Sequence, residues 1–175
     1  MPSAIKRGLS IKADLGIRSP LVVWCWPSMG DNPGYNYDSE SVEWTRYNFL
    51  AFIDSLLSSN LIKSVNVISH SMGGRLGIAS YESFRNSPEK LRNIVFVAPD
   101  VPQSTFSQRS QFYANIGRLK TLYAGKMDKA LLVSQAINGE TRAGIGGRSL
   151  LIMPDFESID ITVYRSCTNK SYSCV

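Results

Sequence analysis

The chain has 175 residues and a hydrophobic fraction of 43%, which suits one domain, residues 1–175, with a substantial buried core. Its formal charge is +5, but the lysines and arginines never form a run of three, so a nucleic-acid partner is not expected. The best apolar run, residues 21–26, is far shorter than the roughly 18 residues that span a membrane. No apolar block of signal-peptide length follows the N-terminus, so the cytoplasm is the default expectation, although a missing upstream segment could have carried an export signal.

The three cysteines form no metal-binding motif. Cys25 lies in the apolar run, where a buried and unreactive thiol is expected. Cys167 and Cys174 lack the Cys-x-x-Cys spacing of zinc sites. A disulfide between them in an oxidising compartment stays open as an alternative.

Strand-like and helix-like segments alternate along the chain. A short helix is expected at 4–15, followed by a strand at 21–26, because a continuous β-rich apolar run is typical of a strand covered on both faces. Residues 39–58 have the apolar spacing of an amphipathic helix. The later segments are expected as strands at 65–69, 93–98, 119–124 and 159–164, and as helices at 72–84, 105–116 and 128–137.

This alternation predicts an α/β fold, a three-layer sandwich around a mostly parallel sheet of about five strands. Ligands of such sheets bind at the carboxyl ends of the strands. A glycine-rich loop at 139–147 lacks the Gly-x-Gly-x-x-Gly spacing of a dinucleotide site, and we interpret it as a mobile loop near the site. The segments that the ligand rule selects are 26–30, 69–73, 98–100 and 125–128.

The sequence around Ser71 has the pattern of a nucleophile elbow, a sharp turn between a strand and a helix with a serine at its tip. Ser69 and Gly73 lie two residues to either side, and their small size lets the strand and the helix approach each other. The more usual pattern has glycine at both positions. The backbone N–H of Met72 would be one donor of an oxyanion hole. The alternative is an ordinary turn in which Ser71 only caps the helix.

A nucleophilic serine needs an acid and a base. Asp128 follows a later strand, in the serine-then-acid order of many hydrolases, although it would serve equally as a helix N-cap. Asp100 competes as the acid, because it also ends a strand, or belongs to a turn that shapes the pocket wall. His70 is the one histidine of the chain, and we expect it to pack beside the elbow instead of acting as the base. Neighbouring side chains on a sharp turn diverge, whereas a base must reach the hydroxyl within about 3.2 Å.

Several motifs occur together: Trp-Pro-Ser at 26–28, the segment 35–38 before a long helix, His-Ser-Met-Gly at 70–73, Ala-Pro-Asp at 98–100, and the segment 122–131. Together they resemble the bacterial esterase/lipase-like α/β-hydrolases, a family of unknown function. The resemblance runs from about Ile5 to the end of the chain. It implies an α/β-hydrolase-like fold with Ser71 as nucleophile and Asp128 as triad acid. It implies no role for Asp100.

Two departures from that family affect the site. Its members begin with an extra strand whose His-Gly-Tyr-Asn-like loop helps to form the oxyanion hole, and they carry a late histidine in a His-Ser-Tyr motif. This sequence is expected to start after that strand, and it has Lys170 in place of the histidine. We therefore expect a partial fold shortened at both ends, without a closing C-terminal helix. Lys170 is a candidate replacement for the base, but a lysine in a polar, near-terminal segment is more simply solvated.

Two hypotheses follow. The first is a serine hydrolase of esterase type that acts on a small-molecule acyl ester, with no metal or organic cofactor required. The second is an impaired or inactive homologue or fragment that binds a ligand or partner, since losing a triad histidine costs on the order of 10⁶ in turnover. The candidate pocket residues are Trp26, Ser28 and Asp100.

Overall fold

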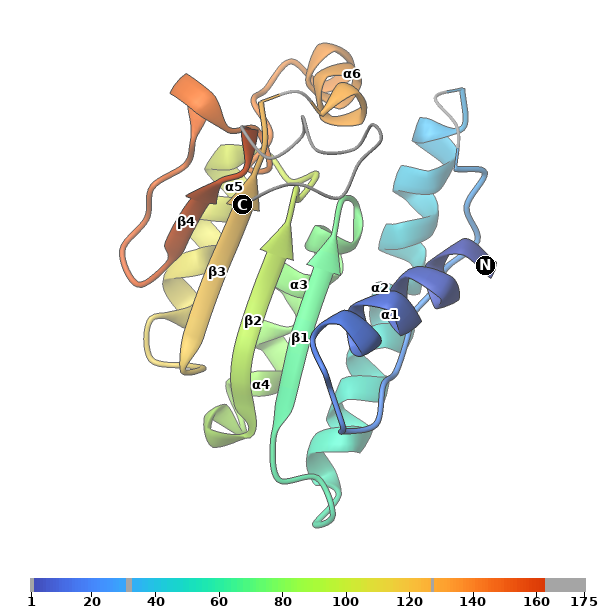
Figure 1. Ribbon diagram of the computed structural model, residues 1–175, viewed down its shortest axis with the longest axis vertical. Coiled ribbons are helices and arrows are strands. Elements are labelled where there is room, and N and C mark those ends of the chain that lie inside the picture. Colours follow the sequence, from blue (N-terminus) through green and yellow to red (C-terminus); the bar gives the residue numbers. More distant parts are fainter. Residues whose placement is uncertain (1, 31–32, 127, 163–175) are drawn as a thin grey trace.

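The computed structural model describes residues 2–30, 33–126 and 128–162, and a parallel sheet lies at its centre (Figure 1). Its strands are β1 (Val65–His70), β2 (Leu91–Val97), β3 (Leu119–Ala124) and β4 (Glu157–Asp160). They lie side by side in chain order, and each pair of neighbours is parallel. Their carboxyl ends therefore lie along one edge of the sheet, where the turns after β1, β2 and β3 come together.

Helices connect the strands and flank the sheet. The α-helices are α1 (Pro2–Asp14), α2 (Tyr35–Ser58), α3 (Gly73–Ala79), α4 (Tyr81–Phe84), α5 (Gln103–Ser110) and α6 (Lys129–Asn138). Short 3₁₀ helices are η1 (Pro88–Lys90), η2 (Gln111–Tyr113) and η3 (Gly147–Ser149). Figure 1 shows α3, α4 and α5 behind the sheet, α1 in front of α2 and beside β1, and α6 above the carboxyl ends of the strands.

The core lies between the sheet and the helices behind it. The strand register aligns Ser69 with Phe96 and Phe96 with Leu122, so these side chains point to the same face. Phe96 and Leu122 are fully buried, and Phe96 makes an edge-to-face contact with Phe106 of α5 at a centroid separation of 4.8 Å. Burial of this apolar surface stabilises the fold and fixes the strand ends relative to α3 and α5.

The front face of the sheet, which faces the viewer in Figure 1, is more exposed. Ile68 of β1 and Leu119 of β3 point to this face and are 45% and 57% exposed. The α/β class is confirmed, and in the described residues the helical layer behind the sheet is the more complete one.

The strand predicted at 21–26 is wrong, and the described part of the chain has four strands where we expected about five. Trp24 of this segment packs on a helix instead, whereas Leu21 and Val22 are exposed. The ring of Trp24 lies 5.4 Å from Phe49 and 5.5 Å from Phe52 of α2. A hydrophobic run indicates burial, and it does not say whether the segment is buried by a sheet or by a helix.

The helix predicted at 72–84 is two helices, α3 and α4, that meet at Ser80. The buried Ser80 hydroxyl donates to the carbonyl oxygen of Gly77 at 2.7 Å and lies 3.0 Å from the hydroxyl of Tyr113. A serine that bonds to the preceding turn competes with the helical hydrogen-bond pattern. The helix predicted at 105–116 is also split, into α5 and η2.

The remaining elements agree with the prediction within a few residues, and β3 has the predicted bounds. At the C-terminal end, β4 begins two residues before the predicted strand and ends at Asp160. None of the helices in the described ranges is both long and apolar enough to cross a bilayer.

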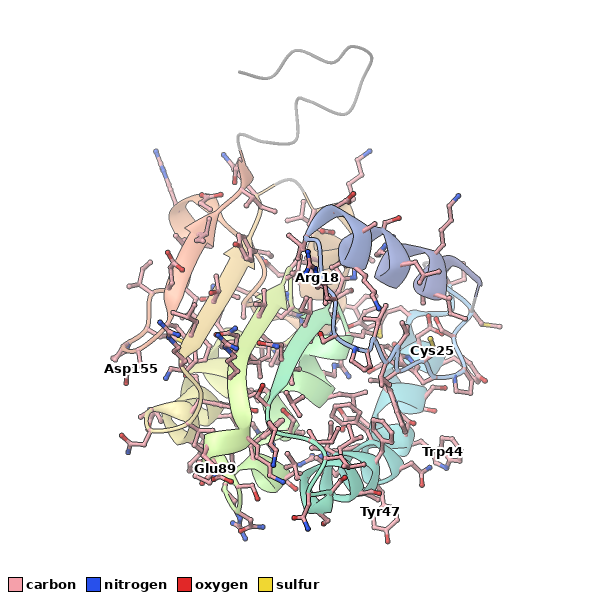
Figure 2. The ribbon with its side chains drawn as sticks, turned by 60° about the horizontal axis from the view of Figure 1, so that its bottom comes forward. Arg18, Cys25, Trp44, Tyr47, Glu89 and Asp155 are labelled. Atoms are coloured by element: carbon pink, nitrogen blue, oxygen red, sulfur yellow. The ribbon has the colours of Figure 1, made fainter. Side chains whose placement is uncertain are left out.

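The cysteine predictions have mixed outcomes. Cys25 is a free thiol that is partly exposed, so the expectation of a buried thiol was wrong; Figure 2 shows it in the segment before α2. Cys167, Cys174 and Lys170 lie outside the described residues. Their disulfide and the replacement base therefore stay predictions.

Candidate active site

The turn after β1 has the backbone geometry of a nucleophile elbow. Ser71 has a φ of +53°, in the left-handed region that residues with a Cβ rarely adopt. Its N–H donates to the carbonyl oxygen of Val97 at 3.1 Å, and its own carbonyl accepts the N–H groups of Gly74 and Asp100, each at 2.9 Å. These hydrogen bonds to α3 and to the end of β2 hold Ser71 in its strained conformation. Backbone strain persists only where the surrounding structure holds the residue in this way.

The close approach of α3 to the sheet depends on Gly77. A Cβ at this position would lie 2.6 Å from the Ser69 Oγ and 2.9 Å from the Phe96 ring. The small size of Ser69 is therefore required by its packing against α3. The elbow pattern calls for a small residue at position 69, and Ser69 meets it. Gly77 lies six residues after Ser71, outside the pattern, so the sequence did not identify it.

The two glycines that follow the elbow have different surroundings. A Cβ on Gly74 would lie 2.7 Å from the Cβ of Pro99, so this position tolerates no side chain without a shift. A Cβ on Gly73, the glycine of the sequence pattern, would lie 3.5 Å from the ring of Trp26, an ordinary contact distance. Trp26 is thus placed beside the elbow, and Gly74 provides the tighter contact between α3 and the end of β2.

Met72 precedes the first residue of α3. In the part of the chain that the structure describes, its backbone N–H donates to no acceptor. The N–H of the residue after the nucleophile is the position from which an elbow supplies an oxyanion donor.

Asp128 follows β3 and caps α6. Its Oδ1 accepts the N–H groups of Ala130 at 3.1 Å and Leu131 at 3.3 Å, so the predicted N-cap is confirmed. These bonds fix the carboxylate at the edge of the sheet that also carries the elbow. They do not exclude a role as triad acid, because each carboxylate oxygen accepts more than one hydrogen bond.

The side chain of His70 is in part exposed and in part surrounded by protein atoms, so the packing that we expected is incomplete. Successive strand residues point to opposite faces, so its ring lies on the front face and the buried Ser69 side chain lies behind. The pKa of His70 is lowered from its ordinary value, mainly because surrounding protein atoms desolvate the ring and further because of the Arg7 charge. The Asp128 carboxylate opposes this shift. Asp128 is therefore within electrostatic reach of the residue that precedes Ser71.

Asp100 is directed into the protein interior. It is 2% exposed, and its carboxylate accepts hydrogen bonds from the hydroxyl groups of Ser134 at 2.5 Å and Tyr35 at 2.9 Å. The Nε of Arg142 lies 3.2 Å from the same carboxylate. The sequence pointed to Asp100, but it gave no signal for the partners, which come from distant segments.

Ser28 faces a second buried carboxylate. Asp38 of α2 is 6% exposed, and it accepts hydrogen bonds from the Ser28 hydroxyl at 2.7 Å and from the N–H groups of Met29 at 2.7 Å and Gly30 at 3.0 Å. Asp38 therefore fixes the shape of the loop that follows Trp26. Asp38 belongs to the family motif at 35–38, but its contacts cannot be read from that motif.

Residues 142–146 of the glycine-rich loop are buried, whereas we interpreted the loop as mobile. Gly144 is buried, and a Cβ on it would lie 2.4 Å from the backbone of Ala98. Asp160 accepts the N–H of Gly147 at 2.7 Å. The pKa of Asp160 is lowered mainly by hydrogen bonds from Thr162 and to a smaller extent by the hydrogen bond from the Gly147 N–H. The loop is thus joined to the ends of β2 and β4.

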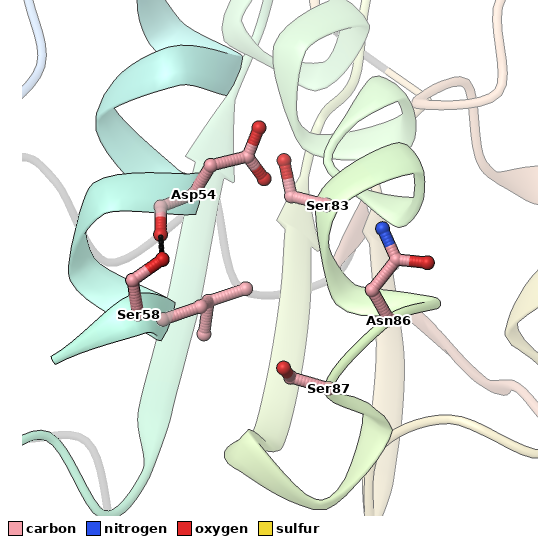
Figure 3. A pocket seen from close by; sticks show the side chains of 6 residues that line it. Asp54, Ser58, Ser83, Asn86 and Ser87 are labelled. Carbon is pink, nitrogen blue, oxygen red and sulfur yellow. Dashed lines mark hydrogen bonds between the residues drawn. The ribbon is translucent and has the colours of Figure 1, made fainter. Parts of the chain in front are cut away.

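A cavity of about 230 Å³ lies between α2 and the α4 region, at the amino ends of the strands and therefore far from the elbow (Figures 1 and 3). Figure 3 shows Asp54 of α2 facing Ser83 of α4, while the Ser58 hydroxyl points back along α2 and donates to the Asp54 carbonyl oxygen at 2.8 Å. None of the candidate site residues lines it. Across the described residues, no cluster of three or more histidine, cysteine or acidic side chains is arranged to hold a metal ion.

A parallel sheet with helices around it, a strained serine directly after one strand and an aspartate after a later strand are features of α/β hydrolases. The family model described as alpha/beta hydrolase of unknown function (DUF900) matches residues 2–162, and the chain belongs to this family. The resemblance found in the sequence is thereby confirmed, and the family supports a hydrolase function. Among curated proteins and among solved structures, none matches the chain.

Proposed function

We propose that the chain is a serine hydrolase of esterase type, with Ser71 as the nucleophile and a small acyl ester as the substrate. The observation that carries this proposal is the φ of +53° at Ser71, in the turn between β1 and α3. Backbone strain of this kind is concentrated at functional sites, and a serine in an ordinary cap would not need it. The family supports the hydrolase function, and the elbow supports the choice of residue.

In the proposed reaction, the Ser71 Oγ attacks the ester carbonyl carbon and the carbonyl oxygen becomes an oxyanion. The N–H of Met72 donates to that oxyanion. The tetrahedral intermediate expels the alcohol, which takes up the proton from Ser71, and water then releases the acid and restores the serine. Asp128 is the proposed acid that orients the base.

The question of which residue acts as the base leads to a second candidate function. If no residue does, the chain is an impaired hydrolase that binds acyl compounds without efficient turnover. The one histidine in the sequence, His70, lies on the front face of β1, where desolvation and then the Arg7 charge disfavour its protonated form. A triad base must accept a proton from the serine, and Lys170 is the other candidate for that step. Without a base, the expected residual rate is roughly 10³–10⁴ over water, supplied by binding and the oxyanion hole.

Hydrolysis of a short-chain p-nitrophenyl ester tests the proposal. We expect slow turnover that Ser71→Ala reduces to the background rate, while Ser58→Ala, a serine substitution at the opposite end of the sheet, leaves it unchanged. His70→Gln measures any contribution of the exposed imidazole to the background. Equal rates for the wild-type chain and Ser71→Ala would contradict the proposal.

The Lys170→His variant separates the two candidates. A gain of at least tenfold in turnover would show that the chain has an intact elbow and lacks the base. If the wild-type chain turns over the ester far faster than the roughly 10³–10⁴ over water expected without a base, and the variant adds nothing, the impaired-hydrolase candidate is wrong.

A further inference from the structure

Asp100 is enclosed by side chains from four separate segments, one of which is α3, where the Nη2 of Arg75 lies 4.0 Å from the carboxylate. Tyr35 begins α2, Ser134 lies on α6, and Arg142 lies in the loop after α6. Ser134 is fully buried and Arg142 is 1% exposed. The Nε of Arg142 also donates to the Ser134 hydroxyl at 2.8 Å, so the two side chains contact the carboxylate and each other.

The backbone of Asp100 contacts the other side of the site. Its N–H donates to the carbonyl oxygen of Ser71 at 2.9 Å. Its own carbonyl oxygen accepts a hydrogen bond from the Nε of Arg75, on α3, at 3.3 Å. Asp100 therefore contacts the elbow through its main chain and contacts α6 through its side chain.

Helix α6 is the helix that Asp128 caps, and Ser134 lies on it six residues after Asp128. The Ser134 hydroxyl donates to Asp100 at 2.5 Å, a short bond to a carboxylate, and such bonds are about twice as strong as those between neutral groups. One buried residue thus connects the segment that bears the proposed nucleophile to the segment that bears the proposed acid.

We propose that Asp100 is a positioning residue, which keeps the Ser71 elbow and the Asp128 end of α6 in a fixed relative position. This proposal rests on the proposed function, because the relative position of Ser71 and Asp128 affects catalysis only if they are the nucleophile and the acid. The proposal gives Asp100 this role in place of that of triad acid, because its carboxylate is buried in the protein interior against Ser134, Tyr35 and Arg142, whereas Asp128 lies at the edge of the sheet. A purely global structural role is the alternative outcome of the test.

Amide hydrogen exchange in the Ser134→Ala variant tests this coupling. The reporters are the N–H groups of Asp100 and Gly74, which bond to the Ser71 carbonyl, and that of Leu131, which bonds to Asp128. We expect exchange to accelerate roughly 10- to 100-fold at all three reporters, the range for loss of one hydrogen bond to a charged group.

The matched control is Ser110→Ala. Ser110 is also a buried helical serine, 6% exposed, and its hydroxyl bonds to the Ser107 carbonyl and the Met153 sulfur, away from the elbow. It should leave the three reporters unchanged. The proposal is overturned if Ser134→Ala accelerates only Leu131, or if Ser110→Ala accelerates the elbow reporters equally.

A second measurement keeps this proposal distinct from the proposed function. The labelling rate of Ser71 by a fluorophosphonate, compared at equal folded fraction, should fall at least fivefold in Ser134→Ala and not in Ser110→Ala. If the wild-type chain is not labelled at all, the proposed function fails, while the exchange data still decide whether Asp100 couples the two segments.

Discussion

At the scale of single residues, the main finding is the conformation of Ser71. A residue with a Cβ at a φ of +53° costs on the order of 1–3 kcal/mol, and glycine would avoid most of that cost. The chain has a serine there, held by hydrogen bonds to Val97, Gly74 and Asp100. Stability alone does not explain this choice of residue, whereas a nucleophile at the tip of the turn does.

Two substitutions of Ser71 measure the strain. We expect Ser71→Gly to be more stable than Ser71→Ala by roughly 1 kcal/mol, because both remove the hydroxyl and only alanine keeps a Cβ at positive φ. Urea denaturation of the two variants gives the difference. Equal stabilities would mean that the turn relaxes in solution to a φ below zero.

The single histidine makes the electrostatics of the site measurable. Its NMR titration should give a pKa below the ordinary 6.5, because desolvation and the Arg7 charge disfavour the imidazolium. Since the folded-state pKa is depressed, protonation destabilises the folded chain as the pH falls through about 6.5.

Charge variants identify the neighbours of His70. Removing the Arg7 charge with Arg7→Gln should raise the pKa, and removing the Asp128 charge with Asp128→Asn should lower it further. Asp54→Asn, at the cavity on the opposite end of the sheet, is the control and should leave it unchanged. If the pKa of His70 does not change in Asp128→Asn, Asp128 lies too far from the elbow to act there as the triad acid.

At the scale of elements, α3 defines the site by how closely it approaches the sheet. Gly74 and Gly77 allow this approach, and neither stands out in the five-residue elbow pattern, which ends at Gly73. The pattern therefore located the turn correctly without showing which glycines its packing requires. The strand expected at 21–26 failed for a related reason: Trp24 packs on α2, and a hydrophobic run does not identify the partner against which it packs.

Adjacent glycines of α3 give a direct test of this packing. Gly74→Ala places a Cβ 2.7 Å from the Cβ of Pro99 and should destabilise the fold by about 1–3 kcal/mol. Gly73→Ala meets Trp26 at 3.5 Å and should be neutral or slightly stabilising, because alanine favours helix. Thermal unfolding of both variants measures the two changes in stability. Similar losses of stability in the two variants would show that the close contact to Pro99 is absent.

At the scale of the whole molecule, the parallel sheet brings Ser71, Asp128 and Asp100 to one edge from turns after three different strands. The alternation of segments was sufficient to predict this edge, because parallel strands place their carboxyl ends together. Contacts between distant side chains, such as Ser134 with Asp100, depend on packing in three dimensions and left no local pattern in the sequence. The family match supports hydrolysis, so the identity of the reactive residue becomes the central question.

Peptide mapping of a fluorophosphonate-treated chain answers that question most directly. A fluorophosphonate reacts with an activated serine hydroxyl and leaves a stable phosphonyl adduct whose position mass spectrometry can assign. The elbow geometry predicts one adduct, on Ser71, that is lost in Ser71→Ala and retained in Ser58→Ala. An adduct on another residue, or a folded wild-type chain that stays unmodified after prolonged treatment, would contradict the assignment of Ser71 as the nucleophile.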